Sequence, residues 1–210
     1  MSIEMRMNSV FCTPVAEFDH PDCGELNGSL ATFIHQLREK GLGESRASTI
    51  RSGWRSKRDL LDYDAPPIRA FRGFVDGCLQ SYVKHWSTLD GLASVPQQFS
   101  HRYKGWAVIL EEGGYQQQHL HSRTDIVGVY CVSVPAPTSG VPDVGGQLTL
   151  IDPRPGRLST RTSWESELVS LDPRPGRLIL MPSYVAHRVE TLLAPGERVT
   201  INFDSIVLSK

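Results

Sequence analysis

The sequence has few of the features that mark membrane or nucleic-acid-binding proteins. Its 210 residues carry 22 basic and 23 acidic side chains, a formal net charge of −1. A chain this close to neutral offers no electrostatic footprint for a nucleic acid. No apolar run approaches the roughly 18 residues that a membrane helix needs. We therefore expect neither a nucleic-acid partner nor a membrane.

Cysteine is also scarce. The four cysteines lie far apart and form no CxxC pair; they are Cys12, Cys23, Cys78 and Cys131. Zinc ligation by cysteine is therefore not expected, and isolated thiols are typical of a reducing compartment. The first residues lack the charged-then-apolar pattern of a secretion signal. These patterns predict a cytoplasmic protein and leave its oligomeric state open.

The first part of the chain, residues 1–98, has a mixed, largely helical pattern. Apolar residues at helical spacing after Asp22 predict one helix, which Gly41 would end. A pair of prolines at Pro66 opens a second helix. Between the two helices, residues 48–57 alternate small and basic side chains, and we expect a loop there.

From residue 99 the pattern changes to short alternating or β-branched runs. The expected strands are residues 106–110, 115–121, 126–134, 146–151, 178–181, 187–193 and 198–208. A turn at residues 111–114 and a loop rich in proline and glycine at 135–145 separate some of them. Strands at this spacing, with no helices between them, indicate an antiparallel sandwich or barrel. The whole chain, residues 1–210, is thus expected to form one α+β domain that is mainly β.

Two histidines stand at alternate positions of one expected strand. His119 and His121 would point to the same face, because successive side chains of a strand alternate. A third histidine, His187, could complete a three-point face around a metal ion and leave positions open for substrate and oxygen. Asp125 lies four residues past His121. It could be a direct ligand of the metal, or it could accept a hydrogen bond from a histidine N–H.

The same alternation predicts a polar wall beside the histidines. Tyr115 and Gln117 share the parity of His119 and His121, so both are expected to line the pocket. A plain core strand would carry apolar residues at these positions.

Arg198 indicates what such a metal site would bind. It shares a face with Thr200, and both would point toward the third histidine if a hairpin through residues 194–196 joins their strands. A buried arginine is costly unless it is paired, and its fork can hold a carboxylate through two parallel hydrogen bonds. The partner is either a ligand or a nearby acid, of which Glu190 and Asp204 are the candidates.

Other basic and aromatic side chains are weaker candidates for substrate contact. Arg51, Trp54 and Arg55 stand in the expected loop before the strands and could fold over the mouth of the site. The alternative is an ordinary basic surface turn.

One heptapeptide, DPRPGRL, occurs unchanged at residues 152–158 and 172–178. Its proline and glycine content predicts two similar turns. Alternatively, Arg154 or Arg174 reaches the mouth of the site and meets an acidic substrate.

Several motifs together carry a family resemblance. They are Gln118-His-Leu-His121, Gly128-Val-Tyr130, Gly145-Gly-Gln-Leu148, Asp152-Pro-Arg154, Pro182-Ser183, His187-Arg-Val189 and Arg198-Val-Thr-Ile201. With them the chain resembles the 2-oxoglutarate/Fe(II) oxygenase family, in its small prolyl-hydroxylase-like branch with an H-x-H...H motif. In the front half, Val10-Phe-Cys-Thr-Pro14 resembles the opening strand of that branch, and Arg51-Ser-Gly-Trp-Arg-Ser56 resembles its loop containing serine and tryptophan.

The resemblance implies a double-stranded β-helix, or jelly roll, over residues 99–210, with the N-terminal helices packed on one sheet. It implies Fe(II) held by His119, His121 and His187, and 2-oxoglutarate held by Arg198 with help from Thr200. The implied activity is hydroxylation or desaturation of a small molecule, amino acid or peptide by O2, with release of succinate and CO2. The wider superfamily has an acidic residue where this chain has His121, so three neutral ligands would leave the metal centre more positive.

Two other functions stay open at this point. A three-histidine, cupin-type dioxygenase would not use 2-oxoglutarate, and Arg198 would then hold the carboxylate of the substrate itself. A jelly roll that only binds structural zinc, or no metal, would not be an enzyme. The sequence does not identify the substrate.

Overall fold

The computed structural model describes residues 11–44, 49–89, 98–137, 143–154 and 166–209. The helices are α1 (Gly24–Glu39), a short 3-10 turn η1 (Leu60–Asp62) and α2 (Pro66–Leu89). The strands are β1 (Ala16–Asp19), β2 (Ile50–Arg55), β3 (Phe99–His119), β4 (Ile126–Ser133), β5 (Leu148–Ile151), β6 (Leu168–Leu171), β7 (Arg177–Pro182), β8 (His187–Val189) and β9 (Glu197–Ser209). No helix in these ranges is both long and apolar enough to cross a membrane.

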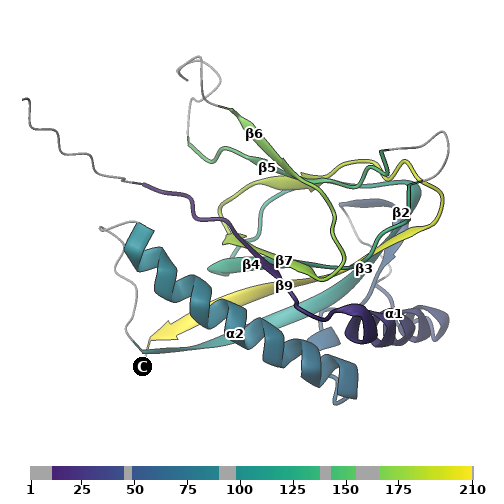
Figure 1. Ribbon diagram of the computed structural model, residues 1–210, viewed down its shortest axis with the longest axis horizontal. Helices are drawn as coiled ribbons and strands as arrows, with labels where there is room; N and C mark the ends of the chain where they lie inside the picture. The colour runs from purple at the N-terminus through teal and green to yellow at the C-terminus, as the bar shows by residue number, and fades with distance from the viewer. Residues whose placement is uncertain (1–10, 45–48, 90–97, 138–142, 155–165, 210) are drawn as a thin grey trace, which may run out of the picture.

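The strands form one curled antiparallel sheet in the order β1-β7-β4-β9-β3-β8-β5-β6, with β2 paired to β3. The long strand β3 belongs to both layers of this curl. Over Phe99–Glu111 it pairs with β9, and from Gln116 onward it pairs with β8. Figure 1 shows β5 and β6 above the layer that contains β4, β7 and β9. This is the mainly β jelly roll that was expected.

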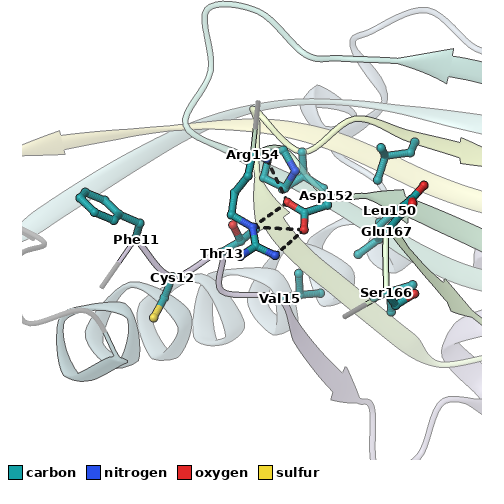
Figure 2. A pocket seen from close by; sticks show the side chains of 13 residues that line it. Phe11, Cys12, Thr13, Val15, Leu150, Asp152, Arg154, Ser166 and Glu167 are labelled. Atoms are coloured by element: carbon teal, nitrogen blue, oxygen red, sulfur yellow. Dashed lines mark hydrogen bonds and ion pairs between the residues drawn. The ribbon is translucent and has the colours of Figure 1, made fainter. Parts of the chain in front are cut away.

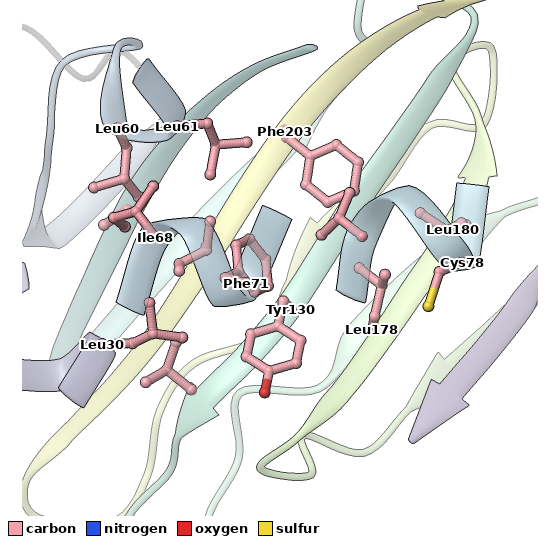
Figure 3. Close-up of a cluster of buried hydrophobic side chains, with 14 of the residues drawn as sticks. Leu30, Leu60, Leu61, Ile68, Phe71, Cys78, Tyr130, Leu178, Leu180 and Phe203 are labelled. Carbon is pink, nitrogen blue, oxygen red and sulfur yellow. The ribbon is translucent and has the colours of Figure 1, made fainter. Parts of the chain in front are cut away.

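The two helices cover the outer face of one layer, as predicted. Figure 3 shows side chains of α1, η1 and α2 against those of β4, β7 and β9. The buried residues include Leu30, Leu60, Ile68, Phe71, Tyr130, Leu178, Leu180 and Phe203. A second cluster fills the inside of the curl with residues of the opposite parity, among them Val108, Leu110, Val127, Val129, Leu148 and Met181. Alternate residues of each strand therefore face either the helices or the interior.

Two predicted boundaries are wrong because the chain forms a strand where a loop or a turn was expected. Residues 48–57 contain β2, which pairs with β3. The predicted turn at 111–114 lies inside β3, where the register against β2 shifts between Gly53 and Arg51. Gly113 has a φ of +76° there. The glycine pair thus marks a bulge within a continuous strand.

Three further expectations on strands need correction. The opening strand is β1, Ala16–Asp19, and not residues 10–14, of which residue 10 lies outside the described ranges. β8 ends at Val189, short of the expected residue 193. β8 and β9 form no hairpin, because β3 lies between them in the sheet.

Candidate metal centre

The three histidines converge at one end of the curled sheet. His119 ends β3 and is the register partner of His187, the first residue of β8, and His121 follows just beyond β3. One ring nitrogen from each residue lies within 4.8 Å of the other two, so the group could hold a metal ion. The convergence predicted from the H-x-H spacing and the distant histidine is thus present in the structure.

Hydrogen bonds fix the orientation of each ring. Every Nδ1 faces an oxygen that only accepts: His119 faces the Gln117 carbonyl at 2.8 Å, His187 the Val185 carbonyl at 3.0 Å, and His121 the Asp204 Oδ1 at 2.5 Å. Each Nδ1 therefore carries the proton, which leaves a lone pair on each Nε2. The Nε2 of His121 is buried and has no hydrogen-bond partner among the described residues. This orphaned acceptor is what a metal-binding imidazole requires.

Burial also keeps two of the rings neutral. Burial and, to a smaller extent, the neighbouring histidines lower the pKa of His187 to about 3. Burial likewise lowers the pKa of His119 below its usual value. Both rings are therefore unprotonated at neutral pH, and only an unprotonated imidazole can donate a lone pair to a metal.

The space between the rings is small. Its volume is about 10 Å³, roughly what one water-sized sphere occupies. Besides the histidines, its polar lining is Trp106, Gln116 and Asn202. The indole N–H of Trp106 is also buried without a partner among the described residues. The cavity suits a single ion, and sequence reasoning did not identify these three polar residues.

The predicted polar wall is shifted by one residue. Gln116, and not Gln117, lines the cavity, and its side-chain amide donates to His119 Nε2 at 3.3 Å. Tyr115 and Gln117 are exposed. The cause is an irregularity in the register of β3 against β8 between Gln116 and His119. Beyond this point, simple alternation no longer predicts which side chains share a face.

Asp125 lies away from the histidines. Its carboxylate accepts the backbone N–H of Val207 at 2.8 Å, and it is not part of the metal-binding group. Asp204 holds the histidine N–H instead. Its second oxygen lies 3.1 Å from Arg58 Nη2, and the Arg58 guanidinium lies 4.1 Å from the centre of the Trp106 ring.

Arg198 is a buried cation without a partner. Its exposed fraction is 3%, and it makes no hydrogen bond or ion pair with any described residue. Its Nε is buried and has no hydrogen-bond partner among them. Both alternative acids are engaged elsewhere: Glu190 pairs with Arg188, and Asp204 with Arg58 and a histidine. Burial lowers the pKa of Arg198. An unpaired buried guanidinium is unfavourable, so this position favours an anionic ligand.

Local backbone geometry makes room for Arg198. Gly146 has a φ of +72°, and a Cβ on it would lie 2.9 Å from Arg198 Cδ. The side chain shares the inward parity of Thr200 and Asn202 on β9, and Thr200 is buried and accepts a hydrogen bond from the Asn202 amide at 3.3 Å. Arg198 and Thr200 thus face the same interior, as expected, although the predicted hairpin is absent.

The candidates on β2 have structural partners. Trp54 packs against the helix-side core and fills the space beside Gly43, where a Cβ would lie 2.3 Å from its indole nitrogen. Arg55 forms an ion pair with Glu44. Arg51 is exposed and donates to a neighbouring backbone carbonyl. None of the three lines the histidine cavity.

Arg154 lies at a separate cavity of about 500 Å³. Figure 2 shows its guanidinium bound to Asp152, 2.7 Å from Nη2 to Oδ2, near the segment that contains Phe11. No histidine lines this cavity. Residues 155–158 of the first heptapeptide lie outside the described ranges. In the second copy, Arg174 lies 3.5 Å from Asp19, so neither arginine reaches the histidines.

Similarity to known proteins places this site in a family. Residues 104–204 match the family model described as "Putative 2OG-Fe(II) oxygenase", a segment that includes the three histidines and Arg198. No curated protein sequence matches the chain. A prolyl-4-hydroxylase from Pseudomonas putida is 15% identical, with a TM-score of 0.63 over 94% of both chains.

Two further solved structures share the fold. HygX from Streptomyces hygroscopicus, solved with nickel and 2-oxoglutarate bound, is 13% identical, with a TM-score of 0.59 over 92% of this chain and 82% of that one. The alpha-ketoglutarate-dependent carbocyclase SnoK from nogalamycin biosynthesis is 9% identical, with a TM-score of 0.64 over 94% and 80%. At these identities the structures establish the jelly roll alone. The match over residues 104–204 covers just under half of the chain, and it makes the segment that carries the three histidines and Arg198 similar to the 2OG-Fe(II) oxygenases, enzymes that depend on iron and 2-oxoglutarate.

Proposed function

We propose that this oxygenase uses His119, His121 and His187 to hold Fe(II) and Arg198 to hold 2-oxoglutarate. The reaction consumes substrate, 2-oxoglutarate and O2 and releases oxidised substrate, succinate and CO2. Hydroxylation is the default outcome, and desaturation would use the same residues. One observation carries the ligand assignment: ring nitrogens of the three imidazoles converge within 4.8 Å of one another, and the Nε2 of His121 is buried without a partner among the described residues.

The chain itself supplies orientation and a dry environment. Iron bound by the three imidazoles supplies the activation of O2 and the oxidising power. The carbonyls and the Asp204 carboxylate keep the rings in the tautomer that can bind metal. Apolar side chains of the inner cluster, such as Val127 and Leu148, exclude water from the cavity.

Arg198 is the residue we assign to the distal carboxylate of 2-oxoglutarate. A carboxylate would satisfy a guanidinium that is otherwise buried and unpaired, through two parallel hydrogen bonds. Thr200 lies one inward position along β9 and could add a third. Because the space between the histidines is about 10 Å³, the inner side chains must move to admit the cosubstrate.

Replacing Arg198 with methionine tests this assignment. The methionine fills similar volume, so the variant should fold, and without ligand it should be at least as stable, since an unpaired buried charge is removed. The KM for 2-oxoglutarate should rise about 100-fold or more, the scale expected when one partner of a buried charge pair is lost. Fe(II) or Co(II) affinity should stay within about twofold, because the residue touches no metal ligand.

Arg188→Met is the matched control, because that arginine lies beside His187 but pairs with Glu190 on the surface. Its KM for 2-oxoglutarate should not change. Equal loss of metal and cosubstrate binding in Arg198→Met would make this arginine structural. Substrate oxidation without 2-oxoglutarate would favour the three-histidine dioxygenase instead.

The substrate class in this proposal is broad: a small molecule, an amino acid or a peptide. Two similar structures illustrate the range: a prolyl hydroxylase bound to a peptide fragment from Trichoplax adhaerens, and HygX bound to hygromycin B. We also propose that residues 1–210 act as one domain in the cytoplasm. The packing of α1 and α2 on the sheet that carries the site supports the first point. The four free cysteines support the second.

A further inference from the structure

A polar cleft lies next to the histidine cavity. Its volume is about 810 Å³, within the usual range of small-molecule sites. Strands β3 and β9, η1, α2 and the segment after His121 contribute its lining. Its charged residues are Arg58, Asp62, Asp76, His101, Arg102, Lys104, Arg123 and Asp204.

The inner rows of β3 and β9 run from the cavity directly into this cleft. Trp106 and Asn202 are register partners and line the cavity. The next inward pair is Lys104 with Asp204, and the pair after it is Arg102 with Ile206. All four residues line the cleft. Each pair lies about 6.6 Å from the previous one. Lys104 and Arg102 are therefore about 7 and 13 Å from the cavity row.

Only a thin wall separates the two spaces. Asp204 lines the cleft and hydrogen bonds to His121, which lines the cavity. Arg58 lines the cleft and lies over the Trp106 ring, and the centroid of that ring is 5.9 Å from the centroid of the His121 ring. A molecule in the cleft is thus one side chain away from the metal ligands.

The cleft has more unpaired positive than negative charge. Arg102, Lys104 and Arg123 are exposed and form no ion pair with any described residue. Among the acids, Asp76 binds His101 at 2.9 Å and Asp204 is held by Arg58. With Asp204 paired to Arg58, only the carboxylates of Asp62 and Asp76 oppose the three cations among the lining residues, so the lining has one net positive charge and favours an anion.

Arg123 adds a second, independent observation. Its φ of +62° is in the left-handed region, which is unfavourable for a residue with a side chain. Two hydrogen bonds of the next residue hold the chain here, from Thr124 Oγ1 to the Ser205 carbonyl at 2.8 Å and from Ser183 Oγ to the Thr124 carbonyl at 2.7 Å. A strained residue that is held in place beside a reaction site is typical of a functional position.

We propose that this cleft binds the substrate by a carboxylate, which Lys104, Arg102 and Arg123 hold several bonds away from the carbon that is oxidised. The inference rests on the proposed function, since it takes the histidine cavity as the reaction site. It narrows the substrate class to extended acids whose reactive end reaches past Trp106.

The test uses the full chain loaded with Mn(II) and 2-oxoglutarate, which binds ligands without turnover. Proton line broadening by Mn(II) is measured for hexanoate and for its neutral analogue hexanamide. Hexanoate should broaden and hexanamide should not, and the methyl end should broaden more than the methylene beside the carboxylate. This direction distinguishes an acid held in the cleft from an acid bound to the metal.

Variants then assign the broadening to the cleft. The triple variant Arg102→Gln, Lys104→Gln, Arg123→Gln should bind hexanoate about tenfold more weakly. Arg69→Gln is the matched control, because that arginine lies on α2 and pairs with Asp64; it should behave as the wild type. Affinity for Mn(II) is measured in every protein.

Four results would each overturn the proposal: equal broadening of hexanamide, stronger broadening at the carboxylate end, an unchanged triple variant, or no broadening at millimolar hexanoate. If the wild type fails to bind Mn(II), the proposed function fails instead. In that case, hexanoate binding is measured by saturation-transfer NMR without the metal. The same variants then decide whether the cleft recognises the acid.

Discussion

The carboxylate of Asp204 is expected to strengthen metal binding through His121, and Asp204→Asn tests this. Asparagine keeps an oxygen where Oδ1 now lies, 2.5 Å from His121 Nδ1, so the ring can keep its tautomer and orientation. The substitution removes the negative charge, and it also replaces Oδ2, the acceptor of Arg58, with an NH2 group. The Asp204 side chain is 16% exposed, so water compensates little for the loss.

The size of the effect follows from distance and screening. With a metal–nitrogen bond of about 2.1 Å, the ion would lie about 7 Å from Asp204 Oδ1. One charge at that distance from a divalent ion is worth about 5 kcal/mol at an effective dielectric constant of 20. Arg58, 3.1 Å from Oδ2, cancels part of this. We therefore expect the metal dissociation constant to rise about 10- to 100-fold, as when other hydrogen-bond partners of metal ligands are removed.

Anaerobic titration with Co(II), followed by visible absorbance, measures this change. Asp125→Asn is the matched control, since its carboxylate contacts backbone and no histidine, and it should bind as the wild type does. Arg58→Gln should bind Co(II) equally or more tightly, because its charge opposes that of the metal. The reasoning is refuted if folded Asp204→Asn binds Co(II) within about twofold of the wild type, or if Asp125→Asn loses as much affinity.

Three further predictions concern stability and the cosubstrate. Gly146→Ala places a methyl at φ +72° against Arg198 and should cost about 1–2 kcal/mol of unfolding free energy; normal 2-oxoglutarate binding in the same variant would contradict the contact. The hydrogen bond that His35 Nε2 donates to the Glu197 carboxylate raises the pKa of His35, so this pair stabilises the fold fully below pH 6.5 and less as pH rises through the folded-state pKa. Urea titrations on both sides of that pH should show a flatter profile for His35→Gln, and an identical slope would show that the pair does not matter. Tyr130→Phe removes a buried hydroxyl that donates to the side-chain oxygen Oδ1 of Asn27 on α1 at 2.7 Å. Chemical denaturation should show a loss of about 1 kcal/mol of unfolding free energy, whereas unchanged stability would mean that water replaces the bond.

Hydrophobic periodicity was enough to predict the helices and most strands. The helical stripe after Asp22 became α1, and the proline pair at Pro66 begins α2. In β9, alternate residues face the helices and the interior, so Arg198 and Thr200 were correctly placed on one face. Each of these elements buries one regular face, and burial of one face is what periodicity records.

The predictions that were wrong concern segments whose local sequence is compatible with two different structures. A glycine pair at Gly113 suits a tight turn, but here it relieves a bulge in β3. The choice between the two depends on β2, which is distant in sequence and pairs on both sides of the bulge. A similar irregularity near His119 exchanges the faces of Gln116 and Gln117. Alternation predicts a face only while the strand stays regular.

Asp204 shows why the surroundings of a site are harder to predict than its ligands. Asp125 is near the histidines in sequence, but its carboxylate turns to the backbone of Val207. Asp204 is 83 residues from His121 and meets it only because β9 pairs with β3. The sequence does show that Asp204 shares the parity of Arg198. The missing information was which strand lies beside the histidines.

The register of β9 against β3 thus determines the charge balance of the whole site. Three neutral imidazoles would leave a bound metal one positive charge higher than two imidazoles and a carboxylate would. The chain keeps a carboxylate one hydrogen bond farther out, on Asp204, and the same inward row of β9 carries Arg198 at its other end. A slip of one residue would turn both charges to the helix-covered face and bring apolar residues such as Val199 and Phe203 inside. Because that slip would also expose the helix-side core, the apolar packing that stabilises the fold also holds the two charges at the two ends of the site.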